Sequence, residues 1–488
     1  MQVLLNYING SAVASASADT TPVIDPTTGL PYCLAPISNA ADVDAAMKAA
    51  SAAFATWKET TPSERQLLLL KIADAFEART DELVSAECRN CGKPKQLTID
   101  EEMAAIIDQI RFFAGACRNL EGKAATCYMK GHLSMIVREP VGVCASITPW
   151  NYPLMMAVWK WAPALAAGNT VVLKPSDTTP VATVLMAQIM GEILPPGVFN
   201  VICGERATGV MLVAHPTPAM VSITGSVGAG KAVAAAAAPS LKRVHLELGG
   251  KAPVVVFGDA DLPAAAEAIA QAGFFNAGQD CTAASRVLVE QSVYAEFVGL
   301  IAREADKIVV GPHAPCGECA TSIEDADIFM GPLNNRAQLE RVKGFLARLP
   351  PHARVVAGGK SPSGPGLGSG GFFFAPTVVA DVRQTDEVVQ EEIFGPVITV
   401  QPFANEEAAI VAANDVRYGL ASSVWTTDHA RALRCSRAFD FGCCWINAHI
   451  PIVAEMPHGG FKQSGYGKDL SAYGFEEYTR VKHVMSRL

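Results

Sequence analysis

Short runs of β-branched residues, separated by stretches of helical pattern, constrain this chain more than any other feature. The alternation begins near Ile136 and includes six runs: Val141–Ile147, Thr170–Leu173, Phe199–Ile202, Met220–Ile223, Val244–Leu246 and Pro253–Phe257. Strands that alternate with helices form a mostly parallel sheet with both faces covered. We therefore predict an α/β fold with a doubly wound sheet, whose ligands bind at the carboxyl ends of the strands.

Helical segments precede this sheet, and a second α/β region follows it from Lys251 to about Ile446. Residues 358–371 are rich in Gly and Pro, and we interpret them as a flexible surface connection. No internal repeat is apparent. Apolar residues recur at three- and four-residue spacing in the segments predicted as helices, which are Val43–Trp57, Glu64–Arg79 and Ile99–Phe113.

Length and charge limit the classes of protein to consider. A chain of 488 residues exceeds what one hydrophobic core supports, so we expect two or three domains. Its 39 basic and 48 acidic residues give a net charge of −9, which argues against nucleic acid or an anionic membrane as the main partner. No apolar stretch reaches membrane-spanning length. The 13 cysteines form no regular framework, and we expect reduced thiols inside a cell.

The last three residues, Ser486-Arg487-Leu488, are similar to the Ser-Lys-Leu address that directs proteins to peroxisomes. A three-residue match is weak, and an ordinary basic tail is the alternative. Residues 1–26 lack the charged and apolar regions of a signal peptide. We therefore expect a cytoplasmic protein, or a peroxisomal or glycosomal one if the C-terminal residues are read as a targeting signal.

Two residues stand where a reaction could be carried out. Cys281 ends the segment 274–281 (FFNAGQDC), whose turn and small or polar neighbours suit a thiol that must meet a substrate. Glu247 lies at the end of an apolar strand, just before Gly249-Gly250, and is expected to be partly desolvated, which suits a general base. The alternatives are a structural cysteine and a carboxylate that caps the next turn.

Three further segments place polar groups after strands. Asn151 can donate a hydrogen bond from its side-chain amide, although it could simply shape a turn. Lys174 ends a strand and precedes Asp177 by three positions. The segment 224–231 (TGSVGAGK) is a Gly-rich strand-to-helix turn, whose backbone N–H groups can approach a pyrophosphate. Each of these signals is weak when taken alone.

In combination the motifs are specific. Their order resembles that of the NAD(P)-dependent aldehyde dehydrogenase superfamily, and they extend from about residue 140 to 470. Seven ordered motifs carry the resemblance: Trp150-Asn151, Lys174-Pro175-Ser176, Gly225–Gly230, Glu247-Leu248-Gly249-Gly250, Gly278-Gln279-x-Cys281, Glu392-Ile393-Phe394-Gly395-Pro396 and Pro457-His458-Gly459-Gly460.

The resemblance implies the aldehyde dehydrogenase fold and a role for each of three residues. Cys281 would be the nucleophile, whose thiolate adds to the aldehyde carbonyl to give a thiohemiacetal. Asn151 and the Cys281 backbone N–H would hold the developing oxyanion. Hydride transfer to the cofactor then leaves a thioester, and Glu247 would activate the water that releases the acid.

The resemblance also implies NAD as cofactor, with NADP as the less favoured alternative. Most relatives have Glu where this chain has Asp177, which is one methylene shorter. A carboxylate there accepts ribose hydroxyls and repels a 2′-phosphate. The residues expected to border the cofactor, from the adenosine ribose to the nicotinamide ribose, are Ile147, Thr148, Pro149, Trp150, Lys174, Ser176, Asp177, Gly225, Ser226, Gly230, Leu248, Glu392 and Phe394.

Within the superfamily, segments 111–115, 276–283, 455–460 and 462–469 are most similar to the γ-aminobutyraldehyde dehydrogenases. This implies an ω-amino aldehyde such as 4-aminobutanal, with betaine aldehyde, a semialdehyde or an aliphatic aldehyde as alternatives. Four residues are candidates for substrate contact, either through charge or as cation–π walls: Asp280, Tyr152, Trp159 and Trp445. Equally, Asp280 could cap a turn and the aromatic residues could belong to the core.

Several other residues are candidates for substrate or metal binding. Acidic residues on the early helix are further candidates for contact with an ammonium group: Asp100, Glu101, Glu102 and Asp108. His458 replaces a common Phe, a change also found in the aminobutyraldehyde subgroup. The spacing of His313, Cys316 and Cys319 could bind zinc, but no fourth ligand is evident and we expect no metal.

The family likeness also implies domains and an assembly. We expect residues 1–121 and 141–249 to form the NAD-binding domain, with a Rossmann-like doubly wound sheet. Residues 250–448 would form an α/β catalytic domain, and 122–140 and 449–488 a small β oligomerisation element of a homodimer or homotetramer. A coenzyme A-acylating enzyme, a non-catalytic structural protein on this fold and a cysteine hydrolase are less favoured, because Glu247, Cys281 and Asn151 are all present and no catalytic His motif is recognisable.

Overall fold

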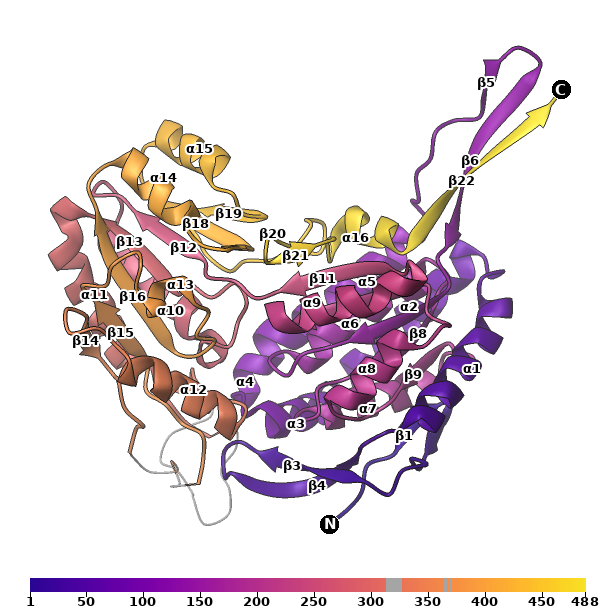
Figure 1. The fold of residues 1–488 in the computed structure, drawn as a ribbon, viewed down its shortest axis with the longest axis horizontal. Coiled ribbons are helices and arrows are strands. Elements are labelled where there is room, and N and C mark those ends of the chain that lie inside the picture. Colours follow the sequence, from indigo (N-terminus) through magenta and orange to yellow (C-terminus); the bar gives the residue numbers. More distant parts are fainter. Residues whose placement is uncertain (313–326, 364–366, 368–369) are drawn as a thin grey trace.

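Two α/β units and a protruding β arm make up the protein (Figure 1). The structure is a computed structural model that describes residues 1–312, 327–363, 367 and 370–488. Part of the Gly-rich segment 358–371, and His313, Cys316 and Cys319, therefore lie outside the described residues. Within the described residues, no helix is both long and apolar enough to cross a membrane.

The first unit is built on an eight-stranded sheet. Its five central strands run parallel. Two further strands at one edge and one at the other each pair antiparallel with the inner neighbour in the sheet. The spatial order places strands that are distant in sequence side by side, as crossover connections require. In that order the strands are β2 (Ser11–Val13), β1 (Asn6–Ile8), β9 (Phe199–Val201), β8 (Thr170–Lys174), β7 (Val143–Ile147), β10 (Met220–Gly225), β11 (Arg243–Leu248) and β21 (Gly465–Tyr466).

Helices cover both faces of this sheet, which confirms the doubly wound fold. Each face has its own apolar core. Helices α2 (Pro62–Ala78), α3 (Thr80–Cys91), α5 (Ala104–Ala116), α6 (Pro153–Ala166) and α7 (Pro180–Gly191) pack on one face. Helices α1 (Ala40–Trp57), α8 (Arg206–Ala214) and α9 (Val227–Ala237) pack on the other. Between α3 and α5 lie the short α4 (Lys95–Leu97) and a π-helical turn, Thr98–Met103.

Local signals explain where these helices begin. Asn39 and Thr61 each cap a helix, and each forms a capping box with the acidic residue three positions later. Such a pair satisfies backbone N–H groups that have no partner inside the helix. Pro153 and Pro180 occupy the first turns of α6 and α7, where a missing N–H costs nothing.

The second unit is a seven-stranded sheet, parallel apart from the β14 edge. In spatial order its strands are β14 (Arg354–Ala357), β15 (Thr377–Ala380), β16 (Val397–Phe403), β13 (Arg286–Glu290), β12 (Pro253–Val256), β18 (Ala421–Trp425) and β19 (Cys443–Ile446). Helices α10 (Leu262–Phe274), α11 (Tyr294–Lys307), α12 (Arg336–Ala347) and the short α13 (Glu387–Gln390) pack on one face. Helices α14 (Glu406–Asn414) and α15 (His429–Ala438) pack on the other.

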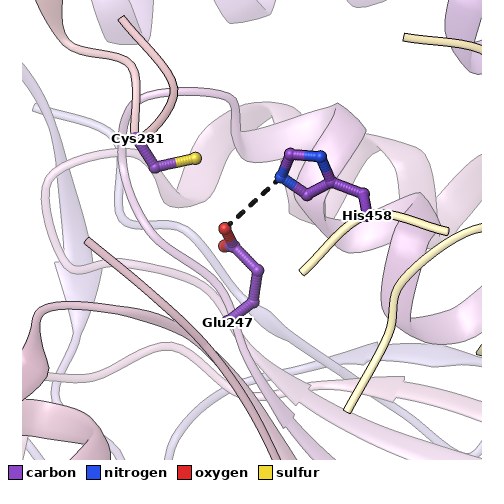
Figure 2. Close-up of side chains that lie close together, drawn as sticks. All are labelled: Glu247, Cys281 and His458. Carbon is purple, nitrogen blue, oxygen red and sulfur yellow. Dashed lines mark ion pairs between the residues drawn. The ribbon is translucent and has the colours of Figure 1, made fainter. Parts of the chain in front are cut away.

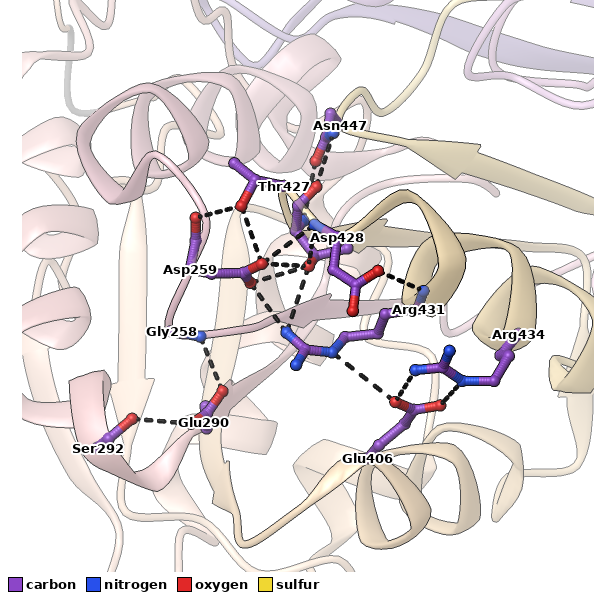
Figure 3. A network of polar contacts seen from close by, with 11 residues as sticks. Gly258, Asp259, Glu290, Ser292, Glu406, Thr427, Asp428, Arg431, Arg434 and Asn447 are labelled. Atoms are coloured by element: carbon purple, nitrogen blue, oxygen red, sulfur yellow. Dashed lines mark hydrogen bonds and ion pairs between the residues drawn. The ribbon is translucent and has the colours of Figure 1, made fainter.

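A polar network closes the carboxyl edge of the second sheet (Figure 3). Asp259 follows β12 and accepts hydrogen bonds from Thr426, Thr427 and the backbone N–H of Asp428. Arg431 pairs with the same carboxylate at 3.0 Å. Cys281 precedes the amino end of β13 and so lies at the opposite edge of this sheet. The network therefore has a structural role.

The β arm extends away from the body (Figure 1). Nine consecutive residue pairs join the C-terminal strand β22 (Thr479–Arg487) to β6 (His132–Pro140), and β5 (Thr126–Met129) completes the sheet. Ser486 and Arg487 thus lie within a paired strand. The remaining strands form two small pairs: β3 (Thr20–Asp25) with β4 (Leu30–Pro36), and β17 (Tyr418–Gly419) with β20 (Phe461–Lys462). The last helix, α16 (Ser471–Glu477), lies beside α6.

Candidate active site

Asn151, Glu247 and Cys281 come together where the two α/β units face each other. Asn151 follows β7 and Glu247 lies near the end of β11, so both stand at the carboxyl edge of the first sheet. Cys281 comes from the second unit, in the loop between α10 and β13. The Cys281 sulfur, a Glu247 carboxylate oxygen and a His458 ring nitrogen lie within 4.8 Å of one another (Figure 2).

The loop that carries the thiol has an unusual backbone. Asn276 has a φ of 49°, in the left-handed region that side chains disfavour. Gly278 follows at φ 66°, and a Cβ there would lie 2.2 Å from a neighbouring carbonyl oxygen. The Asn276 amide donates to the backbone oxygen of Asn151 at 3.0 Å, and Gln279 accepts from the N–H of Asn334 at 2.8 Å. Backbone strain is retained where surrounding contacts fix the geometry, as they do here.

The Asn151 side chain is buried and contacts this loop directly. Its amide nitrogen donates to the carbonyl oxygen of Gln279 at 3.0 Å, two residues before Cys281. An amide nitrogen carries two donors, so one remains for another acceptor. Its amide oxygen has no hydrogen-bond partner among the described residues. The side chain is therefore held close to the thiol with donor capacity left over.

Burial and charge set the protonation state of the thiol. The pKa of Cys281 is raised well above its usual value, first by burial and then by the nearby carboxylates of Glu247 and Asp280. Cys281 is therefore a thiol in the free chain and needs a proton acceptor before it can attack a carbonyl. Glu247 is fully buried, and neither of its carboxylate oxygens has a hydrogen-bond partner among the described residues.

His458 completes this group and was not predicted as a site residue. Its Nε2 lies 3.7 Å from a Glu247 oxygen, and its ring meets that of Trp159 edge-on at 5.1 Å between centroids. The backbone of His458 exchanges hydrogen bonds with Asp469, whose carboxylate accepts from Lys160 at 2.6 Å. The buried Lys160–Asp469 pair thereby fixes the segment that carries His458 against α6.

The residues predicted to hold a pyrophosphate lie at the start of α9. Ser226 is the N-cap and accepts from the N–H of Ala229 at 3.2 Å, which leaves other first-turn N–H groups without helical partners. Gly230 packs so closely on Leu248 that an added Cβ would lie 2.5 Å from its side chain. The Thr224 hydroxyl is buried and unpartnered among the described residues. These features fit an anionic group at a helix N-terminus.

Lys174, Ser176 and Asp177 form a connected group at the end of β8. The Lys174 ammonium is buried and donates to the carbonyl oxygens of Pro175 and Gly204, at 2.7 and 2.8 Å. Burial lowers the pKa of Lys174. The Ser176 hydroxyl donates to Asp177 at 3.2 Å, and Asp177 keeps part of its surface exposed. A carboxylate that remains accessible beside a buried lysine is suited to accept sugar hydroxyls.

The remaining cofactor candidates border the thiol. Trp150 and Phe394 meet edge-on at 5.2 Å between ring centroids, and Phe394 has a φ of 59°. The stretch from Ile147 to Pro149 leads from β7 into the loop that carries Trp150. Glu392 accepts the N–H of Gly250 at 2.9 Å, and burial raises the pKa of Glu392 to about 7. Trp150 from the first unit and Phe394 from the second therefore meet, and Glu392 contacts the backbone of Gly250 that follows β11.

Charged residues cluster behind the nucleophile loop. Lys93 is buried between two carboxylates, at 2.7 Å from Glu102 and 3.5 Å from Glu87. Its ammonium also lies 4.3 Å from the ring centroid of Tyr152, whose hydroxyl donates to Asp280 at 2.7 Å. Burial raises the pKa of Glu87 to about 7. With every group ionised, the three acids exceed the single lysine by two negative charges.

The other substrate candidates differ in their surroundings. The carboxylate of Asp280 also accepts from the backbone N–H and hydroxyl of Thr282, so it caps the turn at the nucleophile. Trp159 is buried, and its indole N–H donates to Gln109 at 2.9 Å. Trp445 is partly exposed and stacks at 4.8 Å on His449. Among the acids proposed on the early helix, Glu102 alone is buried, while Asp100, Glu101 and Asp108 are exposed.

Comparison with known proteins places these features in a family. The model of the aldehyde dehydrogenase family matches residues 12–484, and the chain belongs to this family. The chain is 35% identical to a point mutant of betaine aldehyde dehydrogenase from Staphylococcus aureus, solved with NAD+, with a TM-score of 0.94 and coverage of 100% of this chain and 98% of that one. An aldehyde dehydrogenase homologue from Burkholderia cenocepacia and PnpE in complex with nicotinamide adenine dinucleotide are each 36% identical, with TM-scores of 0.95 and the same coverage.

Lys251 is expected to make the free energy of unfolding depend on pH. It is fully buried, its ammonium has no hydrogen-bond partner among the described residues, and burial lowers its pKa to about 7. Between about pH 7 and 10 the unfolded chain therefore binds more protons at this lysine than the folded one, so stability rises with pH. We expect Lys251→Met to lose a rise of roughly 1.4 kcal/mol per pH unit across that window.

The comparison requires urea unfolding of parent and variant at pH 7.5 and 9.5. Lys343→Met, at an exposed lysine paired with Glu340, is the matched control and should keep the parental pH dependence. An equal rise in the parent and in Lys251→Met would show that Lys251 is not the group responsible.

Proposed function

We propose that this chain oxidises an aldehyde to its carboxylic acid with NAD, through a thiohemiacetal and a thioester on Cys281. The observation that carries the proposal is the convergence of a thiol, a buried carboxylate and a buried amide from two different α/β units. A reaction at a carbonyl carbon uses these three groups as nucleophile, base and oxyanion donor. The neighbours solved with NAD+ support NAD as the cofactor.

Each step follows from the positions of the side chains. Glu247 accepts the thiol proton, because it lies beside Cys281 and neither of its oxygens has a hydrogen-bond partner among the described residues. The sulfur then adds to the carbonyl carbon, and the free donor of Asn151 with the Cys281 N–H stabilises the oxyanion. NAD, when bound, supplies the acceptor for the substrate's hydride. Glu247 then releases the thiol proton to solvent, and as a carboxylate again it draws a proton from the water that cleaves the thioester.

The cofactor would lie along the edge already described. Ser226 and the first turn of α9 would hold the pyrophosphate, while Lys174 and Asp177 would hold the adenosine ribose. Glu392 and Phe394 would hold the nicotinamide ribose. Asp177 supports NAD over NADP, because a 2′-phosphate would be repelled by its carboxylate.

For the substrate we propose an aldehyde that carries a cationic nitrogen, with 4-aminobutanal as the first candidate and betaine aldehyde as the alternative. The Asp280 carboxylate, directly before Cys281 in the chain, supports a cation near the nucleophile, whereas Glu87 and Glu102 are paired with Lys93. Tyr152 contacts both Lys93 and Asp280 and offers an aromatic face to a cation. The test is a panel of 4-aminobutanal, betaine aldehyde, succinic semialdehyde and butanal, each with NAD and with NADP. Preference for an uncharged or anionic aldehyde would reject this substrate class.

Asp280→Asn provides a sharper test of the charge. The amide can still accept hydrogen bonds from Thr282, but the negative charge beside Cys281 is lost. We expect kcat/KM for 4-aminobutanal to fall about tenfold more than kcat/KM for butanal, the equivalent of one charge interaction of roughly 1.4 kcal/mol. Glu101→Gln, at an exposed acid in the π-helical turn Thr98–Met103, is the matched control. Equal losses for the two aldehydes would mean that Asp280 serves only the turn.

The β arm supports a homodimer or homotetramer. Several large apolar side chains on its strands are exposed in the single chain, namely Tyr128, Met129, Val137, Val481 and Met485. Exposed apolar side chains gathered on one element often mark protein contacts. Localisation in the cytoplasm, or in peroxisomes or glycosomes through Ser486-Arg487-Leu488, stays a prediction, as do the proposed domain boundaries.

A further inference from the structure

Cys281, Glu247 and His458 form a group whose ligand atoms all point toward one another (Figure 2). The three atoms are a sulfur, a carboxylate oxygen and an imidazole nitrogen, and all lie within 4.8 Å of one another. Two of the three side chains are more than nine-tenths buried: Glu247 is 0% and His458 4% exposed. Both Glu247 oxygens and the His458 Nε2 lack hydrogen-bond partners among the described residues.

We propose that these three residues form an inhibitory zinc site. Buried charged groups are normally paired or coordinate a metal, and Glu247 has no cation in contact among the described residues beyond His458. Thiolate, imidazole and carboxylate are the ligand types that Zn2+ prefers, with three protein ligands leaving a fourth position for water. This proposal goes beyond the proposed function, because zinc takes no part in aldehyde oxidation here.

The distances suit such an ion after small side-chain movements. Zinc ligands at about 2.0–2.3 Å in a tetrahedral arrangement lie roughly 3.3–3.7 Å from one another. His458 Nε2 and Glu247 Oε1 are already 3.7 Å apart. The three ligand atoms lie within 4.8 Å of one another, so binding requires the side chains to approach by roughly 1 Å. On binding, the thiol loses its proton to solvent and the sulfur forms the bond to zinc.

Zinc held in this way blocks turnover, since it occupies both the nucleophile and the base. The site depends on His458, because a phenylalanine at that position would leave two ligands. Neither His245 nor His449 offers the same arrangement. His449 uses both ring nitrogens, contacting Ser423 and the backbone of Thr282, and His245 faces Ser222 and Asp469.

The test uses Zn2+ itself with the full-length chain, in a background where Cys127, Cys316 and Cys319 are replaced by serine to remove other thiols. Competition with a chromophoric chelator should show one Zn2+ per chain. H458F and E247Q should each weaken binding by at least about 100-fold. H352N is the matched control, because His352 contacts the Asp386 carboxylate at 2.9 Å without a thiol, and it should bind zinc as the background does.

Cobalt provides a readout that activity alone would not give. Co2+ in the site should show a thiolate-to-metal charge-transfer band that C281S abolishes. E247Q keeps the shape of the side chain, and circular dichroism verifies that each variant is folded. Unchanged zinc affinity in folded H458F or E247Q, or a cobalt complex without the thiolate band, would overturn the proposal. Because the measurement is binding, it stands apart from any failure of the proposed dehydrogenase activity.

Discussion

Replacing Cys281 by alanine is expected to lower NADH formation by at least about 10⁴-fold, the scale on which loss of a catalytic nucleophile acts. The reason is that both proposed intermediates are bonded to this sulfur, and the neighbouring Glu247 and Asn151 cannot replace it. NADH formation from a saturating aldehyde measures the effect. Thermal unfolding should be close to that of the parent, because the change removes a single sulfur atom from a side chain that is only partly buried.

Cys127→Ala is the matched control for this change. Cys127 lies exposed in β5, on the arm rather than between the two α/β units. It should retain activity within about threefold, the scale of a neutral surface substitution. If Cys281→Ala kept more than a hundredth of the parental rate, the reaction would not depend on a covalent bond to this cysteine.

Glu247→Gln is expected to lower kcat by about 10²–10⁴-fold, the usual contribution of a general base. The amide fills the same buried space but accepts no proton from the thiol or from water. Hydroxide can replace part of this function, so the ratio of parental to variant rate should shrink as pH rises from 7 to 9.5. Steady-state rates at several pH values measure both effects.

Glu290→Gln controls for the loss of a carboxylate at the end of a strand. Glu290 ends β13 and accepts hydrogen bonds from Gly258 and Ser292 (Figure 3). These contacts lie at the carboxyl edge of the second sheet, whereas Cys281 precedes its amino edge. Its variant should keep both the parental rate and the parental pH profile. A Glu247→Gln enzyme with parental kcat, or with a ratio independent of pH, would assign the base to another residue.

Much of the fold follows from local sequence. The six β-branched runs all correspond to strands, because alternating strands and helices favour sheets covered on both faces. Five of the runs belong to the first sheet, whereas Pro253–Phe257 forms β12 of the second. The edges of the first sheet were not predicted. Asn6–Ile8 and Gly465–Tyr466 are too short to show a period, and each joins the sheet only through partners that lie far away in sequence. Similarly, the helical pattern of Ile99–Phe113 conceals the π-helical turn at its start.

The candidate active site was likewise predicted only in part from the sequence. Cys281, Glu247 and Asn151 each stand beside a turn or strand end, but their roles were predicted from the order of the motifs that resemble the family. His458 was recognised as a departure from the usual Phe, but its contact with Glu247 spans more than 200 residues and depends on the final tail. The ion pairs of Lys93 and the capping role of Asp280 likewise depend on the packing of separate elements. Such contacts are properties of the folded chain, and no local pattern records them.

We expect the acyl group of the substrate to be bonded transiently to the Cys281 sulfur. Acid quenching during turnover with NAD and excess aldehyde, followed by peptide mapping by mass spectrometry, tests it most directly. We predict that the peptide containing Cys281 gains the mass of the acyl group, and that hydroxylamine removes it as it does a thioester. Acylation of a different residue, or rapid NADH formation with an unmodified Cys281 peptide, would contradict the account.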